Sequence, residues 1–424
     1  MKGKKIIGLM LSVMLIGGVA AGCGNKGDAS GSAGSSGGKK TTITYWQHSS
    51  QARDKMMQDL AKEFMEKNKD IEVKMEFIPE DSYSTKLIST LATDAAPDVM
   101  QVESGMIPRL AKAGSIQPLD EKILSTEKIS SEFIPAAVDG LKYEGKYYGL
   151  PTDTQTIVLY WNKDLLKEAG LDAEKGPKTW DELREWAVKL TKTQNGKMTQ
   201  SGWGVKGYNP EVQALIAQYG GKMVDEKGKY IFADDPKSVE AIKFMVDTYK
   251  KDKVYDTQFM KNWAGFRQGK VAMMLGHPAM FGNLKQTAPN VNLGMSLIPA
   301  KDGKNTTIVT SWAYVASKKA NSEAATKWIE FLASKDVQKK WTKQTGELPT
   351  RKELINDEEL TSDPQTKLLL SSMEDSQVGY LQMGILNKIW GQYFDKMILT
   401  DAPVEQTLQD LQKELNTEIS KDLK

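Results

Sequence analysis

Residues 71–77 read Ile-Glu-Val-Lys-Met-Glu-Phe, with apolar and polar side chains in strict alternation. This period of two predicts a half-buried strand. Amphipathic patterns predict a helix on either side, over residues 53–67 before the strand and from Ser82 after it. Further short strands are expected at residues 43–46 and 98–102. Strands that alternate with helices in this way imply parallel pairing, with helices on the faces of an α/β sheet.

The rest of the chain contains both kinds of element. Convincing helical patterns cover residues 180–190, 236–250 and 323–332, and the chain from about Gln365 onward reads as almost all helix. Strand patterns cover residues 271–275, 291–298 and 308–316, and a hairpin turn is expected at residues 225–228. The 424 residues exceed the roughly 250–300 at which one hydrophobic core stops growing. Two lobes are therefore expected.

The first residues have the pattern of an export signal. Basic residues at positions 2, 4 and 5 precede an apolar run over residues 6–21, which is shorter than the roughly 20 residues needed to span a bilayer. The run ends in Ala20-Ala21-Gly22-Cys23. This ending resembles a lipobox, in which the cysteine is acylated, although Ala20 stands where leucine is usual. We expect residues 1–22 to be a lipoprotein signal peptide; an ordinary signal followed by an incidental cysteine is the alternative.

The segment after Cys23 is rich in glycine and serine up to residue 40. Such a composition cannot bury apolar surface and predicts a flexible coil. Residues 23–40 are therefore expected to be an acylated cysteine with its tether, which anchors the protein to the cell membrane. Cys23 is the only cysteine, so the exported part has no disulfide. Without the three signal lysines, the formal net charge of +2 becomes about −1, which gives no indication of nucleic-acid binding.

Five segments, taken together and in order, resemble the extracellular solute-binding proteins of carbohydrate ABC importers, the maltodextrin-binding-protein-like family. They are the Pro-Asp-Val step at 97–99, the stretch at 110–120, the Gly-Lys-Tyr-Tyr-Gly-Leu-Pro run within 143–151, the pair of motifs at 160–164 and 177–183, and the Phe-Arg-Gln-Gly-Lys-Val-Ala-Met run at 266–273. They span most of the chain.

The resemblance implies a two-lobed α/β fold with a ligand cleft between the lobes and hinge crossovers near residues 151, 311 and 350. Mapped by motif, the N-terminal lobe holds residues 41–150 plus 313–349, and the C-terminal lobe holds 153–309 plus 352–424. The lobes would close around a sugar and present it to permease subunits. No cofactor, metal or nucleic acid is implied, and a monomer is expected.

Sugars present hydroxyl groups, which polar side chains bond, and C–H faces, which stack on aromatic rings. Ligands of α/β sheets lie outside the carboxyl ends of the strands. Candidate residues after predicted first-lobe strands are Trp46, Gln47, His48 and Glu103. Candidates at the expected crossovers are Asp153, Gln155, Trp312 and Arg351. For each, packing in the core or a solvated side chain is the alternative reading.

Second-lobe candidates follow from the resemblance. The family supplies an aromatic side chain after the loop at residues 202–204, which here is followed by Tyr208 and Asn209. His277 follows the strand at 271–275, where the family often has glycine and tryptophan, so the histidine is a departure. Trp263 and Gln382 complete the set.

Three other functions remain open. A lipoprotein glycosidase would need two facing carboxylates, which the sequence cannot show. A binding protein of the same fold for an acidic sugar or a phosphorylated polyol would need a cationic cleft, which Arg351 and the two histidines permit. An adhesion or signalling lipoprotein is the third alternative, and the order of the motifs argues against it.

Overall fold

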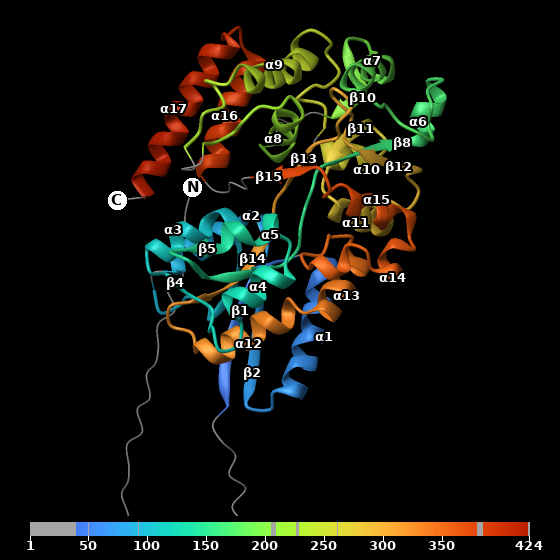
Figure 1. The fold of residues 1–424 in the computed structure, drawn as a ribbon. Coiled ribbons are helices and arrows are strands. Elements are labelled where there is room, and N and C mark those ends of the chain that lie inside the picture. Colours follow the sequence, from blue (N-terminus) through green and yellow to red (C-terminus); the bar gives the residue numbers. More distant parts are fainter. Residues whose placement is uncertain are drawn as a thin grey trace, which may run out of the picture. The chain divides into compact units, whose positions relative to one another are not determined.

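A computed structural model of the chain describes residues 40–49, 51–91, 93–204, 209–225, 229–260, 262–379 and 385–422. These residues belong to one unit, Lys40–Lys424. Helices and strands are both abundant in this unit (Figure 1), which confirms the predicted α/β class. Within the described ranges, no helix is long and apolar enough to cross a membrane.

The first sheet combines the predicted parallel strands with strands from later in the chain. Its strand order is β2-β1-β3-β14-β4, and β7 also pairs with β14. β1 is parallel to both β2 and β3, as the alternation of strands and helices predicts, whereas β14 is antiparallel to β3. The strands are β1 (Thr41–His48), β2 (Ile71–Ile78), β3 (Val99–Glu103), β4 (Ile116–Gln117), β7 (Gly149–Pro151) and β14 (Trp312–Ser317).

Helices from two distant parts of the chain cover this sheet. One continuous core joins residues between Ile43 and Leu150 to residues between Trp312 and Trp341. In it, the rings of Phe64 and Trp328 pack edge to face, with centroids 4.9 Å apart. We call this sheet and its helices the first lobe. The helices are α1 (Gln51–Lys67), α2 (Glu80–Thr90), α3 (Ile107–Lys112), α4 (Thr126–Glu132), α5 (Pro135–Val138), α12 (Ser322–Leu332) and α13 (Lys335–Thr345), and a small hairpin pairs β5 (Lys142–Tyr143) with β6 (Lys146–Tyr147).

The second sheet has five strands in the order β12-β8-β11-β10-β9. β8 is buried along its whole length, so it shows no alternation of polar and apolar residues. The strands are β8 (Val158–Asn162), β9 (Lys192–Gln194), β10 (Lys197–Gly204), β11 (Val271–Gly276) and β12 (Leu293–Leu297).

Ten helices of the described residues surround this second sheet, and a two-stranded parallel sheet accompanies them. We call these elements together the second lobe; its two cores lie between residues 157 and 415. Late in the chain, α16 and α17 pack on each other and on α9 (Figure 1). The elements are α6 (Lys163–Glu168), α7 (Trp180–Leu190), α8 (Asn209–Gln218), α9 (Pro236–Lys250), α10 (Asn262–Arg267), α11 (Ala279–Thr287), α14 (Glu358–Thr361), α15 (Pro364–Ser371), α16 (Ile385–Leu399), α17 (Val404–Asp422), β13 (Thr307–Val309) and β15 (Ser376–Val378).

Three chain segments connect the lobes side by side. Gln155 and Thr310 exchange two backbone hydrogen bonds of 2.8 Å each. On its other side, Thr154 donates its backbone N–H to the carbonyl oxygen of Leu348 at 2.8 Å and accepts from the Leu348 N–H at 3.2 Å. The first crossover segment, at Thr154 and Gln155, therefore lies between two others. It is hydrogen-bonded to the segment after β13 on one side and to the segment after α13 on the other.

One prediction about the late elements is wrong. Residues 308–316 do not form one strand, because β13 and β14 belong to different sheets and the chain changes lobe between them. The C-terminal part is almost all helix, as predicted, and its one described strand is β15, which pairs in parallel with β13. The hairpin expected around residues 225–228 has its closing bridge at Val224 and Tyr230, and residues 226–228 lie outside the described ranges.

Candidate functional site

Four strands of the first lobe bring predicted site residues to one edge of the sheet. His48 ends β1, and Glu103 ends β3. Trp312 begins the antiparallel strand β14 and pairs directly with Glu103. The chain leaving β7 joins the same edge, because Thr152 donates its backbone N–H to the carbonyl oxygen of Trp312 at 2.8 Å. We call His48, Glu103, Asp153 and Trp312 the edge cluster.

Two aromatic rings of the edge cluster lie against each other. The centroids of His48 and Trp312 are 4.6 Å apart, with an angle of 38° between the ring planes. Tyr83 of α2 borders both rings, with centroid distances of 6.0 Å to His48 and 6.3 Å to Trp312. The phenol is fixed because its hydroxyl donates to the backbone carbonyl of Trp46 at 3.2 Å and also to that of Gln101. The three rings therefore pack together as a buried cluster beside polar groups.

Burial keeps the His48 imidazole neutral. It lowers the pKa of His48 from its ordinary value to about 3, and the positive charge of the neighbouring Arg53 acts in the same direction. Arg53 lies in the first turn of α1 and approaches the imidazole Nε2. Its other terminal nitrogen forms an ion pair with Glu347, whose carboxylate also accepts a hydrogen bond from the Trp341 indole.

Two buried carboxylates complete the edge cluster. Glu103 and Asp153 are each 1 % exposed. The Gln155 side chain donates to Asp153 Oδ2 at 2.8 Å, and the Thr152 hydroxyl donates to the other oxygen. Carboxylate oxygens accept only, so they suit the hydroxyl donors of a polar ligand.

Two predicted residues of β1 lie next to this cluster. Trp46 is half-buried against the first core, with the Lys86 ammonium 4.4 Å from its ring centroid. Gln47 is buried and accepts a hydrogen bond of 2.9 Å from the Tyr45 hydroxyl. Its amide nitrogen has no hydrogen-bond partner among the described residues.

Three predicted residues belong to the second lobe. Asn209 begins α8, is buried, and accepts a hydrogen bond from the Gln213 side chain. Trp263 of α10 is half-buried, with the Arg267 guanidinium 5.4 Å from its ring centroid. His277 follows β11, and burial lowers its pKa to about 4. The contacts of Asn209 and Trp263 described above lie within their own helices, α8 and α10.

Arg351 has several contacts inside the first lobe. Its Nε donates to the carbonyl of Ala333 at 2.7 Å, and Nη1 pairs with Glu132 at 2.9 Å. The guanidinium also covers the Phe133 ring, 4.7 Å from its centroid. These contacts tie the third crossover to the first lobe, and contact of Arg351 with a ligand stays a prediction.

Three predicted residues, Cys23, Tyr208 and Gln382, lie outside the described residues. Within the described ranges, no group of three or more histidine, cysteine, aspartate or glutamate side chains could hold a metal ion.

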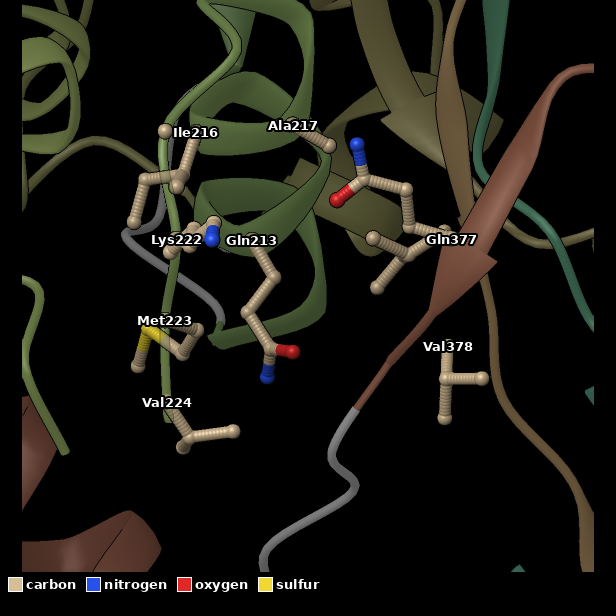
Figure 2. Close-up of a pocket in the computed structure, with 10 residues that line it drawn as sticks. Gln213, Ile216, Ala217, Lys222, Met223, Val224, Gln377 and Val378 are labelled. Atoms are coloured by element: carbon tan, nitrogen blue, oxygen red, sulfur yellow. The ribbon is translucent and has the colours of Figure 1, made fainter. Parts of the chain in front are cut away.

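A cavity of about 210 Å³ lies in the second lobe between α8, residues 221–224, β13 and β15. Figure 2 shows the side chain of Gln213 extending from α8 between the chain at residues 222–224 and β15. Sequence reasoning selected none of its ten lining residues. One feature of the sequence could have pointed to this cavity: Gln213 lies one helical turn after Asn209, which was a candidate site residue. One short chain segment links the cavity to the edge cluster. Ile308 lines the cavity, and Trp312 of the edge cluster follows four positions later.

Comparisons with known proteins identify relatives of this chain. The model of one family, described as bacterial extracellular solute-binding protein, matches residues 48–339. A maltotriose-binding protein of Pyrococcus abyssi is 26% identical over 334 residues, which are 76% of this chain and 69% of the relative. An sn-glycerol-3-phosphate-binding periplasmic protein of Escherichia coli K12 is 27% identical over 334 residues, 74% of this chain and 75% of the relative. Among solved structures, an ABC transporter solute-binding protein of Thermotoga lettingae bound with alpha-D-tagatose has a TM-score of 0.78 and 26% identity, covering 89% of this chain and 99% of the other.

Proposed function

The chain belongs to the bacterial extracellular solute-binding proteins, and from this premise we propose that it captures a neutral sugar or oligosaccharide for an ABC importer. The observation that carries the proposal is the edge cluster. Its paired rings offer a face for sugar C–H groups, and the buried carboxylates beside them offer acceptors for hydroxyl groups. A relative named for maltotriose and a similar solved structure bound with alpha-D-tagatose support this class of ligand.

The charges near the edge cluster favour a neutral ligand over an acidic one. Arg53 is paired with Glu347, and Arg351 is paired with Glu132. His48 is neutral, whereas Asp153 and Glu103 add carboxylates. A phosphate or an acidic sugar would need cations that are not already paired. A phosphorylated polyol remains the second candidate, because the E. coli relative is named for sn-glycerol 3-phosphate.

The separation between the cavity and the edge cluster favours a ligand longer than one sugar ring. Trp312 in the edge cluster lies four positions after Ile308 at the cavity, and an extended chain of that length spans at most about 13 Å. A ligand that reaches both would contact both lobes. We place Tyr208, Asn209, Trp263, His277 and Gln382 on the second-lobe side of this ligand, and Trp46, Gln47, Gln155 and Arg351 near the first-lobe side.

Hinge bending at the three crossover segments would close the lobes. The proposed bodies are residues 41–150 plus 313–349 and residues 153–309 plus 352–424. The backbone pairing of Gln155 with Thr310 and of Thr154 with Leu348 supports a hinge here. Short paired segments can change their dihedral angles while each lobe keeps its core.

The proposed receptor acts outside the cytoplasm as a monomer fixed to the membrane. Residues 1–22 would be removed as a signal peptide, and lipid on Cys23 would hold the protein through the tether at residues 23–40. Several acyl chains anchor a protein stably, whereas one alone does so only marginally. In this proposal the protein binds its sugar without hydrolysing it, since an importer receives its sugar intact.

A calorimetric titration with maltotriose, mannotriose, D-tagatose and sn-glycerol 3-phosphate tests the ligand class. We expect binding of at least one of the sugars and none of the phosphate ester. At 100 times its dissociation constant, a sugar should stabilise the fold by about 2.7 kcal/mol and raise the melting temperature by a few degrees. If only sn-glycerol 3-phosphate binds, the ligand is a phosphorylated polyol and the proposal of a neutral sugar is wrong. Release of glucose from maltotriose would show a hydrolase.

A further inference from the structure

Asp153 of the edge cluster lies between hydrogen bonds to the two other crossover segments. On one side, Thr152 donates its backbone N–H to the carbonyl oxygen of Trp312 at 2.8 Å. On the other side, Thr154 donates its backbone N–H to the carbonyl oxygen of Leu348 at 2.8 Å. The backbone is therefore fixed on both sides of Asp153, and the orientation of its carboxylate depends on the two side-chain torsions.

Two side chains hold this carboxylate, one on each oxygen. The Thr152 hydroxyl donates to Oδ1, and the Gln155 amide donates to Oδ2 at 2.8 Å. Rotation of the carboxylate would break both hydrogen bonds. Asp153 is 1 % exposed, so bonds to bulk water do not readily replace the two that would be lost.

Gln101 of β3 determines what the Thr152 hydroxyl can do. The side-chain amide of Gln101 donates to the Thr152 oxygen at 3.4 Å, and both residues are buried. A hydroxyl has a single proton, so Thr152 accepts from the amide and donates to one other atom. Its possible acceptors are Asp153 Oδ1 and the Trp312 carbonyl oxygen, which is 3.4 Å away. A carboxylate is a stronger acceptor than a peptide carbonyl, so the proton points to Asp153.

His48 decides which end of the Gln101 amide faces Thr152. The imidazole is hydrogen-bonded to the Gln101 side chain. Its Nε2 faces the Arg53 guanidinium, which can only donate, so the one proton of the neutral ring is on Nδ1. That proton goes to the amide oxygen, which leaves the amide nitrogen for Thr152. A chain of donors thus runs from Arg53 through His48, Gln101 and Thr152 to Asp153.

We infer that Gln101 and Thr152 are positioning residues, which hold the Asp153 carboxylate in one orientation toward the bound sugar. For the contact between Asp153 and a sugar hydroxyl, this role rests on the proposed function. A carboxylate has about four lone-pair positions, so an oxygen that accepts from Thr152 can accept a second proton from a ligand. A carboxylate that is already oriented loses less freedom on binding, and affinity rises accordingly.

Two substitutions at Thr152 separate the hydroxyl from the volume of the side chain. Thr152→Val keeps the shape and loses the hydroxyl, whereas Thr152→Ser keeps the hydroxyl. In calorimetry with maltotriose or mannotriose, we expect the affinity of the valine variant to fall about tenfold and that of the serine variant to stay within about twofold of wild type. Equal affinities of the two variants would overturn the inference.

Thr248→Val is the matched control in the second lobe. Thr248 is buried in α9, and its hydroxyl donates to the carbonyl oxygen of Met245 at 2.7 Å. The control therefore also loses one buried hydroxyl bonded within the protein, and it should keep its affinity. A similar loss of affinity in Thr248→Val would show that lower stability alone explains the effect of Thr152→Val.

The role of Gln101 is tested by removing its amide. In Gln101→Met the Thr152 hydroxyl loses the donor that restricts it and can turn to the Trp312 carbonyl as well. We expect the affinity to fall about threefold, less than in Thr152→Val, because Gln101 acts one step further from the carboxylate. Unchanged affinity in a folded Gln101→Met protein would refute the part of Gln101.

Crystal structures without ligand measure the orientation itself. In the wild-type protein we expect one orientation of the Asp153 carboxylate, with Thr152 and Gln155 on opposite oxygens. In Thr152→Val the carboxylate should be rotated or occupy two orientations. The same single orientation in both proteins would refute the positioning role, whatever the protein binds. Absence of sugar binding by a wild-type protein with the expected orientation would instead contradict the proposed function.

Discussion

Trp312 contributes to two parts of the molecule at once. Its side chain is 9 % exposed and belongs to the first core, yet its ring also lies against His48 at the sheet edge. It is the first residue of β14, directly after the crossover that connects the lobes. A change at this single residue should therefore affect both stability and binding.

Truncation of this indole should weaken sugar binding more than the loss of stability alone explains. For Trp312→Ala we expect about 3–5 kcal/mol of destabilisation from the lost buried volume. Affinity for maltotriose should also fall at least tenfold, measured calorimetrically at a temperature where the variant is folded. Trp312→Phe should have a stability and an affinity between those of the wild-type protein and those of Trp312→Ala. The matched variant Trp390→Phe changes a buried residue of the second lobe and should affect only unfolding. Full affinity in a folded Trp312→Ala protein would remove Trp312 from the site.

The two histidines should make the fold less stable in mild acid. In the unfolded chain a histidine has a pKa of about 6.5, whereas burial lowers the pKa of folded His48 to about 3. Between these values the unfolded state binds more protons, so stability falls as the pH drops below about 6.5. At pH 5 the expected loss from His48 is about 2 kcal/mol. His277 adds a loss of the same sign, since its folded pKa is lowered to about 4.

Urea unfolding at pH 7 and pH 5 measures this effect. His48→Gln should remove a large part of the difference between the two pH values, and His48→Gln/His277→Gln should remove nearly all of it. Carboxylates with lowered pKa values, such as Asp234 and Asp363, lose their contribution only at lower pH. Equal stability of the wild-type protein at both pH values would contradict the prediction.

At the scale of single elements, α7 approaches β10 closely enough to require a glycine. A Cβ atom at Gly202 would lie 1.8 Å from the carbonyl oxygen of Ala187 in α7. Both atoms are fixed by the backbone, so Gly202→Ala must push the helix away from the sheet. We expect a destabilisation of about 1–3 kcal/mol by urea unfolding, from overpacking. Gly140→Ala is the matched control, because nothing lies within 4 Å of its added Cβ. Equal stability of the two variants would show that α7 can shift away from the sheet without lowering the free energy of unfolding.

Elements with local stop and start signals were predictable from sequence. The bounds of α7 and α9 agree with the prediction because capping side chains precede them: Thr179 accepts from the Glu182 N–H at 3.2 Å, and Asp235 precedes Pro236. The strand pattern over residues 308–316 missed the break between β13 and β14, because such a pattern records burial but not the sheet to which a residue belongs; the resemblance had implied a crossover near residue 311. Three-residue β15 is too short to give a pattern at all.

The same reasoning applies to the site. The rule about strand ends selected His48 and Glu103, and the structure brings these to one edge with Trp312. Arg53 and Glu347 were missed because they are 294 positions apart in sequence and meet only through folding. For Arg351, sequence shows an arginine at a crossover but not the carbonyl and the carboxylate that its nitrogens already bind.

At the scale of the whole molecule, the proposed lipid anchor separates location from binding. In Cys23→Ala the acylated residue is lost, while the unit Lys40–Lys424 is unchanged. We expect the protein to move from the membrane pellet to the soluble extracytoplasmic fraction, with its affinity for sugar unaltered. Immunoblots of the fractions measure the first effect, and calorimetry on purified protein measures the second. Membrane retention of Cys23→Ala would show another attachment.

The position of β14 also has a consequence for biosynthesis. This strand pairs with β3, β4 and β7, so the first sheet lacks its central member until residue 317 has left the ribosome. Translation delivers about 5–20 residues per second, and the second sheet is encoded within the intervening stretch. The nascent chain must therefore wait many seconds with an incomplete first lobe. An incomplete first lobe over this interval is compatible with passage of the chain through a secretion channel before the first lobe folds.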